Sequence, residues 1–144
     1  MRALVLALLA AFAVLVVAPQ AIAEDVRMRV IVHKENPASK LSKQFIADAF
    51  LKKRTRWGDD AAIQPVDLGA RDGVRAKFSH DVLDRDVTAV KRYWAQLVFS
   101  GRGVPPPEVG SEADAVAYVA KHPGAIAYVS STASLDGVKA ITVE

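Results

Sequence analysis

Two arginines and a glycine gather where a predicted strand gives way to a predicted helix. Val66–Leu68 alternates apolar and polar residues with the period of a strand, whereas Val74–Val82 places an apolar residue at every fourth position, as on one face of a helix. Gly73 lies between the two patterns, and Arg71 and Arg75 flank it. Unpaired N–H groups at a helix start attract anions, so the segment predicts a small anion-binding corner. The residues alone favour the plainer interpretation, an ordinary strand-to-helix turn with two solvated arginines.

Catalytic and metal-binding patterns are not found in the sequence. The three histidines, His33, His80 and His122, are far apart, and none has a second ligand at the short spacing typical of a zinc site. There is no Gly-x-Ser-x-Gly motif for a nucleophilic serine, and there is no cysteine. We therefore expect a protein that is not an enzyme, with no catalytic residues, no metal and no cofactor.

Residues 1–23 have the pattern of an export signal. Arg2 supplies the charged start, Ala3–Ala18 is an unbroken apolar run, and Ala21–Ala23 has the small-x-small form of a cleavage site. The alternative is a membrane anchor, but the apolar run is shorter than the ~20 residues that a span needs. We predict cleavage after Ala23 and a periplasmic location without stable membrane insertion.

The remaining residues, 24–144, are expected to form one domain. They number 121, enough to build a core without disulfides. Loss of Arg2 with the signal leaves 18 basic and 16 acidic residues, a balance too even to indicate nucleic-acid binding. The one local excess, Lys52–Arg56, fits either the negative end of a helix dipole or a binding patch.

Strand and helix patterns alternate along this domain. The period-two patterns predict strands at Val26–Val32, Val66–Leu68, Ala125–Ser130 and Val138–Val143. The period-3.6 patterns and the capping residues predict four helices: from Ser42 to about Lys53, over Val74–Val82, over Val87–Phe99 after a cap at Asp86, and from Ser111 to His122. Pro105–Pro107 is expected to be an extended loop. The alternation indicates an α/β domain with a small mixed sheet.

Two separated motifs give the chain a resemblance to a known family. Asn36-Pro37, the Ser42-capped helix through Phe50-Leu51 and the turn at Arg56-Trp57 resemble a signature of phosphate-type periplasmic substrate-binding proteins. Pro123–Val129 is similar to that family's "Pro-Gly-Ala-Ile-Gly-Tyr-Val" strand, with Ala127 in place of the second glycine. The resemblance extends over nearly all of Arg29–Ser130. It implies one lobe of a type-II periplasmic-binding-protein fold, a small mixed sheet flanked by helices, in a receptor that serves an ABC importer.

The resemblance also implies a ligand site, and the sequence departs from the family there. Where the family has Arg-x-Asp-Gly-Ser-Gly-Thr, this chain has Ala70 through Ala76, which keeps Asp72 and Gly73 but loses the first arginine and both hydroxyls. Each lost hydrogen bond to a charged ligand is worth about 1.5–3 kcal/mol, so only weak binding of phosphate or another small oxyanion is expected. The residues assigned to this site are Arg71, Asp72, Gly73 and Arg75.

Two functions follow as hypotheses. The first is an exported, non-enzymatic solute-binding domain related to phosphate importer receptors, with an importer permease or other envelope protein as partner. The alternative is a periplasmic interaction or regulatory module that has lost ligand binding and docks through its former ligand face or the Lys52–Arg56 edge. The kinship requires Val66–Leu68 and Ala125–Val129 to share one sheet, and Gly73 to lie at a helix start. Whether another chain supplies a second lobe stays open.

Overall fold

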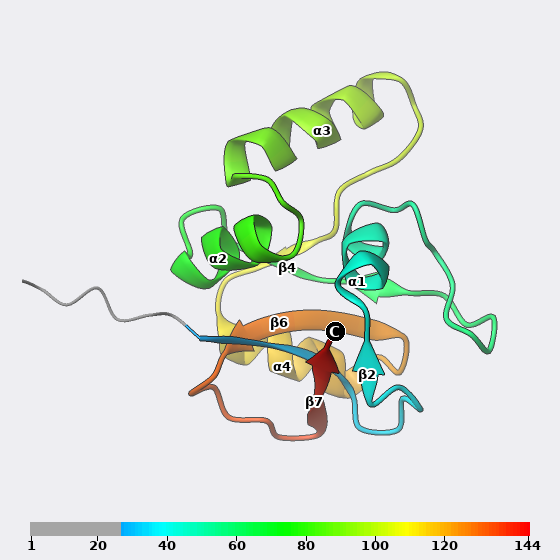
Figure 1. The fold of residues 1–144 in the computed structure, drawn as a ribbon, viewed down its shortest axis with the longest axis vertical. Coiled ribbons are helices and arrows are strands. Elements are labelled where there is room, and N and C mark those ends of the chain that lie inside the picture. Colours follow the sequence, from blue (N-terminus) through cyan, green and yellow to red (C-terminus); the bar gives the residue numbers. More distant parts are fainter. Residues whose placement is uncertain (1–26) are drawn as a thin grey trace, which may run out of the picture.

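The computed structural model describes residues 27–144, which form a mixed α/β domain (Figure 1). The predicted signal segment 1–23 and residue Val26 lie outside the described residues. The elements are β1 (Met28–His33), β2 (Lys40–Leu41), α1 (Lys43–Phe50), β3 (Gln64–Pro65), β4 (Asp67–Leu68), α2 (Gly73–Asp81), α3 (Val87–Phe99), β5 (Glu108–Val109), α4 (Glu112–Lys121), β6 (Ala125–Ser130) and β7 (Val138–Val143). None of the helices in this range is both long and apolar enough to cross a bilayer.

The main sheet has five strands in the order β2-β7-β1-β6-β3. β1 lies at its centre, antiparallel to β6 and β7, while β2 is parallel to β7 and β3 is parallel to β6. The predicted small mixed sheet flanked by helices is therefore confirmed. α2 and α4 both pack on β1 and β6. Because Ala125–Val129 is buried at every residue, the two faces of β6 are both covered, which explains its continuous apolar sequence.

The core is built around three rings from α1, α2 and β6. Phe78 stacks on Tyr128 with ring centroids 3.9 Å apart, and Phe50 packs against Phe78 at 4.6 Å. In β1 the consecutive residues Val30, Ile31 and Val32 are all buried, so the predicted alternation of inner and outer faces does not hold there. The reason is that a central strand of this sheet has helices on both sides.

The predicted helix starts are confirmed. Ser42 Oγ accepts a hydrogen bond from Phe45 N at 3.1 Å, Asp86 Oδ1 accepts one from Ala89 N at 2.6 Å, and Ser111 Oγ accepts one from Asp114 N at 3.1 Å. Each side chain thus satisfies an N–H that the helix itself leaves unpaired. α1 ends at Phe50, three residues before the predicted end, so Lys52–Arg56 lies in the exposed segment after the helix.

The prediction of one continuous strand at Val66–Leu68 is wrong, because the segment passes from one sheet to another. β3 pairs with β6, and Val66 N continues this pairing by donating to Ile126 O at 2.9 Å. Asp67 and Leu68 then leave the main sheet and pair with β5 in a separate two-stranded sheet. β5 follows the proline segment, for which the sequence predicted only an extended loop. The kinship was expected to require Val66–Leu68 and Ala125–Val129 to lie in one sheet. Of the first segment, only Val66 continues the pairing with β6.

Candidate functional site

α2 begins at Gly73, as the predicted anion-binding corner requires. The turn before it is closed by Asp72 N, which donates to Gly69 O at 2.9 Å. Gly73 is exposed, and a Cβ atom added to it would meet nothing within 4 Å. Within residues 27–144 the N–H of Gly73 has no recorded acceptor. The helix therefore presents a free donor at its positive end.

Asp72 serves as the N-cap of α2. Its Oδ1 accepts a hydrogen bond from Val74 N at 2.8 Å, and its own carbonyl accepts one from Ala76 N at 3.1 Å. The carboxylate therefore already places a negative charge at the helix start, where a bound anion would lie. Arg71, next to it, is exposed, and no hydrogen bond or ion pair of its side chain is recorded with any other described residue.

Arg75 is not an exposed cation, because its side chain is only 4% exposed. Its guanidinium lies 3.2 Å from Asp67 Oδ2, and one of its terminal nitrogens donates to Glu108 Oε1 at 2.5 Å and to Leu68 O at 2.6 Å. It therefore connects α2 to β4 and β5. Arg71, Asp72 and Gly73 lie together at the surface of the turn, and Arg75 is fixed beneath it by the chain's own carboxylates.

Tyr128 completes this buried cluster from β6. Its hydroxyl donates to Asp67 Oδ1 and accepts a hydrogen bond from Leu68 N at 3.3 Å. Burial raises the pKa of the Asp67 carboxyl, although the positive charge of Arg75 opposes this rise. Burial and the neighbouring Asp67 both raise the pKa of the Tyr128 hydroxyl. For Arg75, burial acts to lower the pKa, but the carboxylates of Asp67 and Glu108 outweigh it and the net shift is upward.

The sequence did not identify Asp67, Glu108 and Tyr128 as partners of Arg75. The one sequence feature that could have pointed to this cluster is Asp67, a carboxylate between two apolar strand residues. The alternating pattern places Asp67 on the solvent-facing side of the strand, so its burial was not expected. Buried carboxylates require a cationic partner, so an aspartate inside a core strand could have indicated Arg75 on the next helix.

The turn before α2 lies at a particular edge of the fold. β3 is parallel to β6, and β4 is parallel to β5, so their carboxyl ends point the same way and α2 and α4 both begin beyond them. In open α/β sheets, ligands bind in the crevice at that edge. Glu112, the first residue of α4, is held there because its Oε2 accepts a hydrogen bond from Ser130 N at 2.6 Å.

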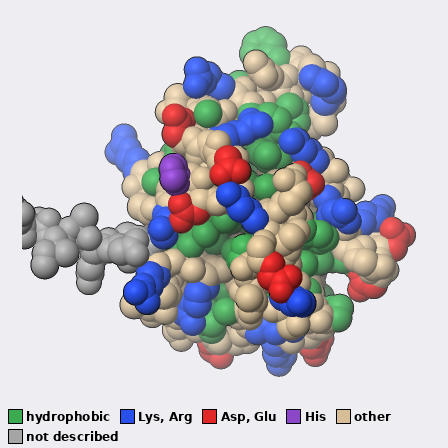
Figure 2. Space-filling view, viewed as in Figure 1, with side chains coloured by type: hydrophobic (Ala, Val, Ile, Leu, Met, Phe, Trp, Pro, Cys, Tyr) green, Lys and Arg blue, Asp and Glu red, His purple; other side chains and the backbone are tan. Residues whose placement is uncertain are grey.

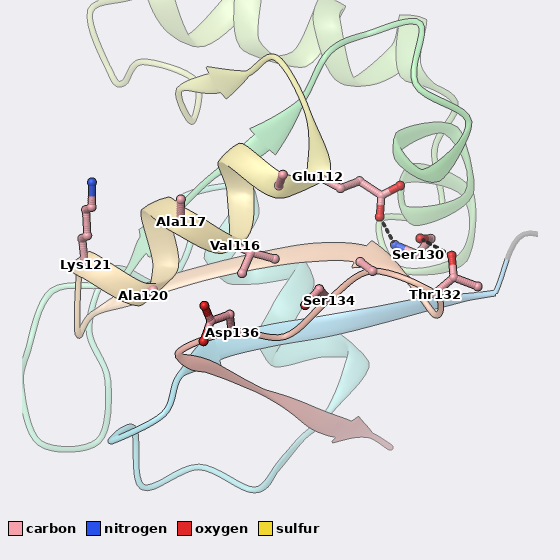
Figure 3. A pocket seen from close by; sticks show the side chains of 11 residues that line it. Glu112, Val116, Ala117, Ala120, Lys121, Ser130, Thr132, Ser134 and Asp136 are labelled. Atoms are coloured by element: carbon pink, nitrogen blue, oxygen red, sulfur yellow. Dashed lines mark hydrogen bonds between the residues drawn. The ribbon is translucent and has the colours of Figure 1, made fainter.

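A cavity of about 610 Å³ lies beside Glu112, between α4 and the segment that joins β6 to β7 (Figure 3). Glu112, Ser130 and Thr132 lie at one end of it, whereas Lys121 is drawn at the other end of α4. The floor between them is formed by small apolar side chains of α4 such as Val116. Among the described residues, no group of three or more carboxylates and imidazoles could hold a metal ion.

Comparison with known proteins identifies the fold. Residues 28–142 match the family described as "PBP superfamily domain". An ABC-type phosphate transport receptor from Vibrio cholerae has a similar structure, with a TM-score of 0.62 and 20% identity over 82% of this chain. A putative phosphate ABC transporter substrate-binding protein from Clostridium perfringens, solved with bound phosphate, gives a TM-score of 0.65 and 24% identity over 82% of this chain. No curated protein matches the sequence significantly.

The match covers one lobe of these receptors. The chain spans 46% of the Vibrio protein and 45% of the Clostridium protein, so it is about half their length. At these identities the likeness shows the fold, and the family match extends over most of the chain. The chain therefore belongs to the PBP superfamily, as a single lobe of the type-II fold found in phosphate ABC transporter receptors.

Proposed function

We propose that this protein is an exported, non-enzymatic solute-binding domain that holds a small oxyanion weakly at the start of α2. The observation that supports this most directly is the open start of α2, where the free N–H of Gly73 lies in a turn that also carries the exposed Arg71. A helix N-terminus with an adjacent cation is a favourable environment for phosphate or sulfate. The structural neighbours are phosphate receptors, which makes phosphate the first ligand to test.

Three features make the expected binding weak. The carboxylate of Asp72 repels an anion at this point, and Arg75 is engaged by Asp67 and Glu108. A single lobe also leaves its ligand in contact with water, so solvent and salt screen the attraction. We expect a dissociation constant on the order of millimolar, because each missing charged hydrogen bond costs about 1.5–3 kcal/mol.

We also propose that the protein is exported and that it acts with a transport partner. Residues 1–23 are proposed to direct secretion and to be removed after Ala23, which leaves residues 24–144 in the periplasm. The partner proposed from kinship is an ABC importer permease or another envelope protein. Mass spectrometry of the protein recovered from the periplasm tests the first part, since an N-terminus other than Glu24 would contradict the cleavage site.

Isothermal titration of residues 24–144 with phosphate and with sulfate tests the oxyanion site. Arg71→Ala should weaken binding several-fold, whereas Arg92→Ala should not, because Arg92 is also an exposed arginine but belongs to α3. Circular dichroism establishes that each variant is folded. The absence of heat at millimolar ligand with a folded sample would end the ligand-binding proposal, and equal effects of the two variants would reject the site at α2.

A second candidate function, docking to a protein, is favoured by the end of α3. Phe99 is 95% exposed, Val104 60% and Val98 51%, so three apolar side chains lie on the surface close together in sequence. Figure 2, drawn from the same side as Figure 1, shows apolar side chains at the top of the molecule, which is the end occupied by α3. Residues 87–107 also contain Lys91, Arg92 and Arg102 and no acidic residue. Such a surface fits an envelope protein with an acidic, apolar groove.

Light scattering and crosslinking in periplasm test this alternative. If the surface docks a protein, Phe99→Ser should abolish the crosslinked complex while phosphate binding at α2 is unchanged. A control change, Val143→Ser, alters an exposed apolar residue elsewhere and should leave the complex intact. A strictly monomeric protein without a crosslinked partner would reject the docking function.

A further inference from the structure

A second cavity of about 530 Å³ lies at the end of the sheet opposite to the α2 turn. It is formed by the loop between β1 and β2, the first turns of α1, the loop after α1 and the segment that leads into β6; the two loops are at the right of Figure 1. Its lining includes the apolar residues Leu41, Phe45 and Trp57, the backbone at Gly124, and the charged residues Glu35 and Asp59. The volume is in the range typical of small-molecule sites.

The aromatic wall of this cavity is held in place by the backbone. Phe45 and Trp57 stack with ring centroids 5.6 Å apart, and Trp57 Nε1 donates to Gly124 O at 3.0 Å. A Cβ atom at Gly124 would lie 2.3 Å from Ala62 O, so the chain approaches too closely here for any other residue. The indole is therefore fixed before a ligand arrives.

The charges that line the cavity are all negative. Glu35 and Asp59 are its only charged lining residues, and Lys, Arg and His do not occur among them. Neither carboxylate forms a recorded ion pair within residues 27–144; Asp59 Oδ1 accepts only a backbone hydrogen bond from Ala61 N at 3.1 Å. The rim therefore carries two negative charges without a cationic partner.

Phe45 is already in contact with a cation in this structure. The guanidinium of Arg54 lies over its ring, 4.8 Å from the centroid, although Arg54 is not a lining residue of the cavity. Aromatic faces attract cations through the negative charge at the ring face, and carboxylates nearby strengthen the attraction. Aromatic side chains that line a cavity are used to recognise quaternary ammonium ligands.

We propose that this cavity binds a small organic ammonium ion, in which a positively charged nitrogen carries a compact apolar body. The apolar body would contact Trp57 and Leu41, and the positive charge would face Glu35 and Asp59. The inference is independent of the oxyanion site, because phosphate would be repelled by the same two carboxylates. The cavity beside α4 lacks this chemistry, because it has no aromatic lining residue and includes Lys121.

Titration with choline chloride tests this site, because choline has the proposed charge and size. Its uncharged isostere, 3,3-dimethylbutan-1-ol, has the same shape without the charge and serves as the matched ligand. We expect choline to bind several-fold more tightly than the alcohol, because the alcohol lacks the charge that the ring faces and the two carboxylates attract. Of the two tryptophan indole N–H signals in the NMR spectrum, choline should shift that of Trp57 and leave that of buried Trp94 in place.

The double variant Glu35→Gln/Asp59→Asn removes both charges and keeps the shape of the side chains. It should weaken choline binding several-fold, and the amide oxygen of the new asparagine can still accept the hydrogen bond from Ala61 N. The control variant Asp114→Asn/Asp136→Asn removes two exposed carboxylates elsewhere, so it changes net charge equally and should bind choline as the parent does. No saturable choline binding, equal binding of the alcohol, or equal effects of the two double variants would each overturn the proposal.

Discussion

At the scale of single residues, the buried arginine is the residue for which sequence and structure differ most. The sequence assigns Arg75 to the ligand site because it flanks the glycine at the predicted helix start. In the fold its side chain is directed into the protein, where Asp67, Glu108 and the Leu68 carbonyl are its partners. Sequence spacing gives the helix position of a residue, but it does not tell which distant carboxylate will be buried beside it. That pairing depends on β5, a two-residue strand that has no periodic pattern.

Arg75→Met should destabilise the protein by about 3–5 kcal/mol at pH 7, because Asp67 then remains buried without its cation. The penalty should decrease as the pH is lowered. Burial already raises the pKa of Asp67 in the folded protein above its unfolded value, so the folded state binds the proton more readily and the cost of the buried charge disappears on acidification. Urea unfolding between pH 4.5 and 7.5 measures this. A penalty that does not change with pH would mean that Asp67 is not the cause, and adding Asp67→Asn should recover part of the loss.

Gly124→Ala should destabilise the fold by about 1–3 kcal/mol, because the new methyl group would lie 2.3 Å from Ala62 O and the backbone would have to move. Gly58→Ala is the matched control in the same region, since a Cβ there meets nothing within 4 Å. Thermal unfolding of both variants measures the difference. If the two variants unfold at the same temperature, the close approach of β6 to the loop after α1 is wrong.

At the scale of elements, the helices were predicted well because their signals are local. A capping side chain and a repeat of 3.6 residues both lie within one element, and Ser42, Asp86 and Ser111 act as N-caps as expected. β2, β3 and β5 were not predicted, because a two-residue strand is defined only by its partner. The segment from Val66 to Leu68 changes sheets in mid-course, and no alternation of residues can indicate that change.

Asp86→Ala tests how far α3 depends on its cap. The variant should lose about 1 kcal/mol, since Ala89 N would have no acceptor, whereas Asp86→Asn should remain close to the parent because asparagine caps as well as aspartate. Urea denaturation gives the free energies. Equal losses in both variants would indicate that the charge of Asp86, rather than its hydrogen bond, supports the helix start.

At the scale of the whole molecule, the decisive property is that the chain spans less than half of the receptors it resembles. A receptor with two lobes encloses its ligand between them, whereas a single lobe presents it to water on one side. Under the proposed oxyanion function, the affinity for the anion would therefore depend on whether another molecule covers the edge where α2 and α4 begin.

Ionic strength provides the test at this scale. The Debye length falls from about 30 Å at 0.01 M salt to about 10 Å at 0.1 M, so an oxyanion held in the open by Arg71 and the start of α2 should lose affinity several-fold over that range. Arg71→Ala should show a smaller loss, because less charge remains to be screened. Titration of phosphate at several salt and protein concentrations measures both effects. An affinity that does not depend on salt would indicate an enclosed site, and if that affinity also increases with protein concentration, another copy of the chain is acting as the missing lobe.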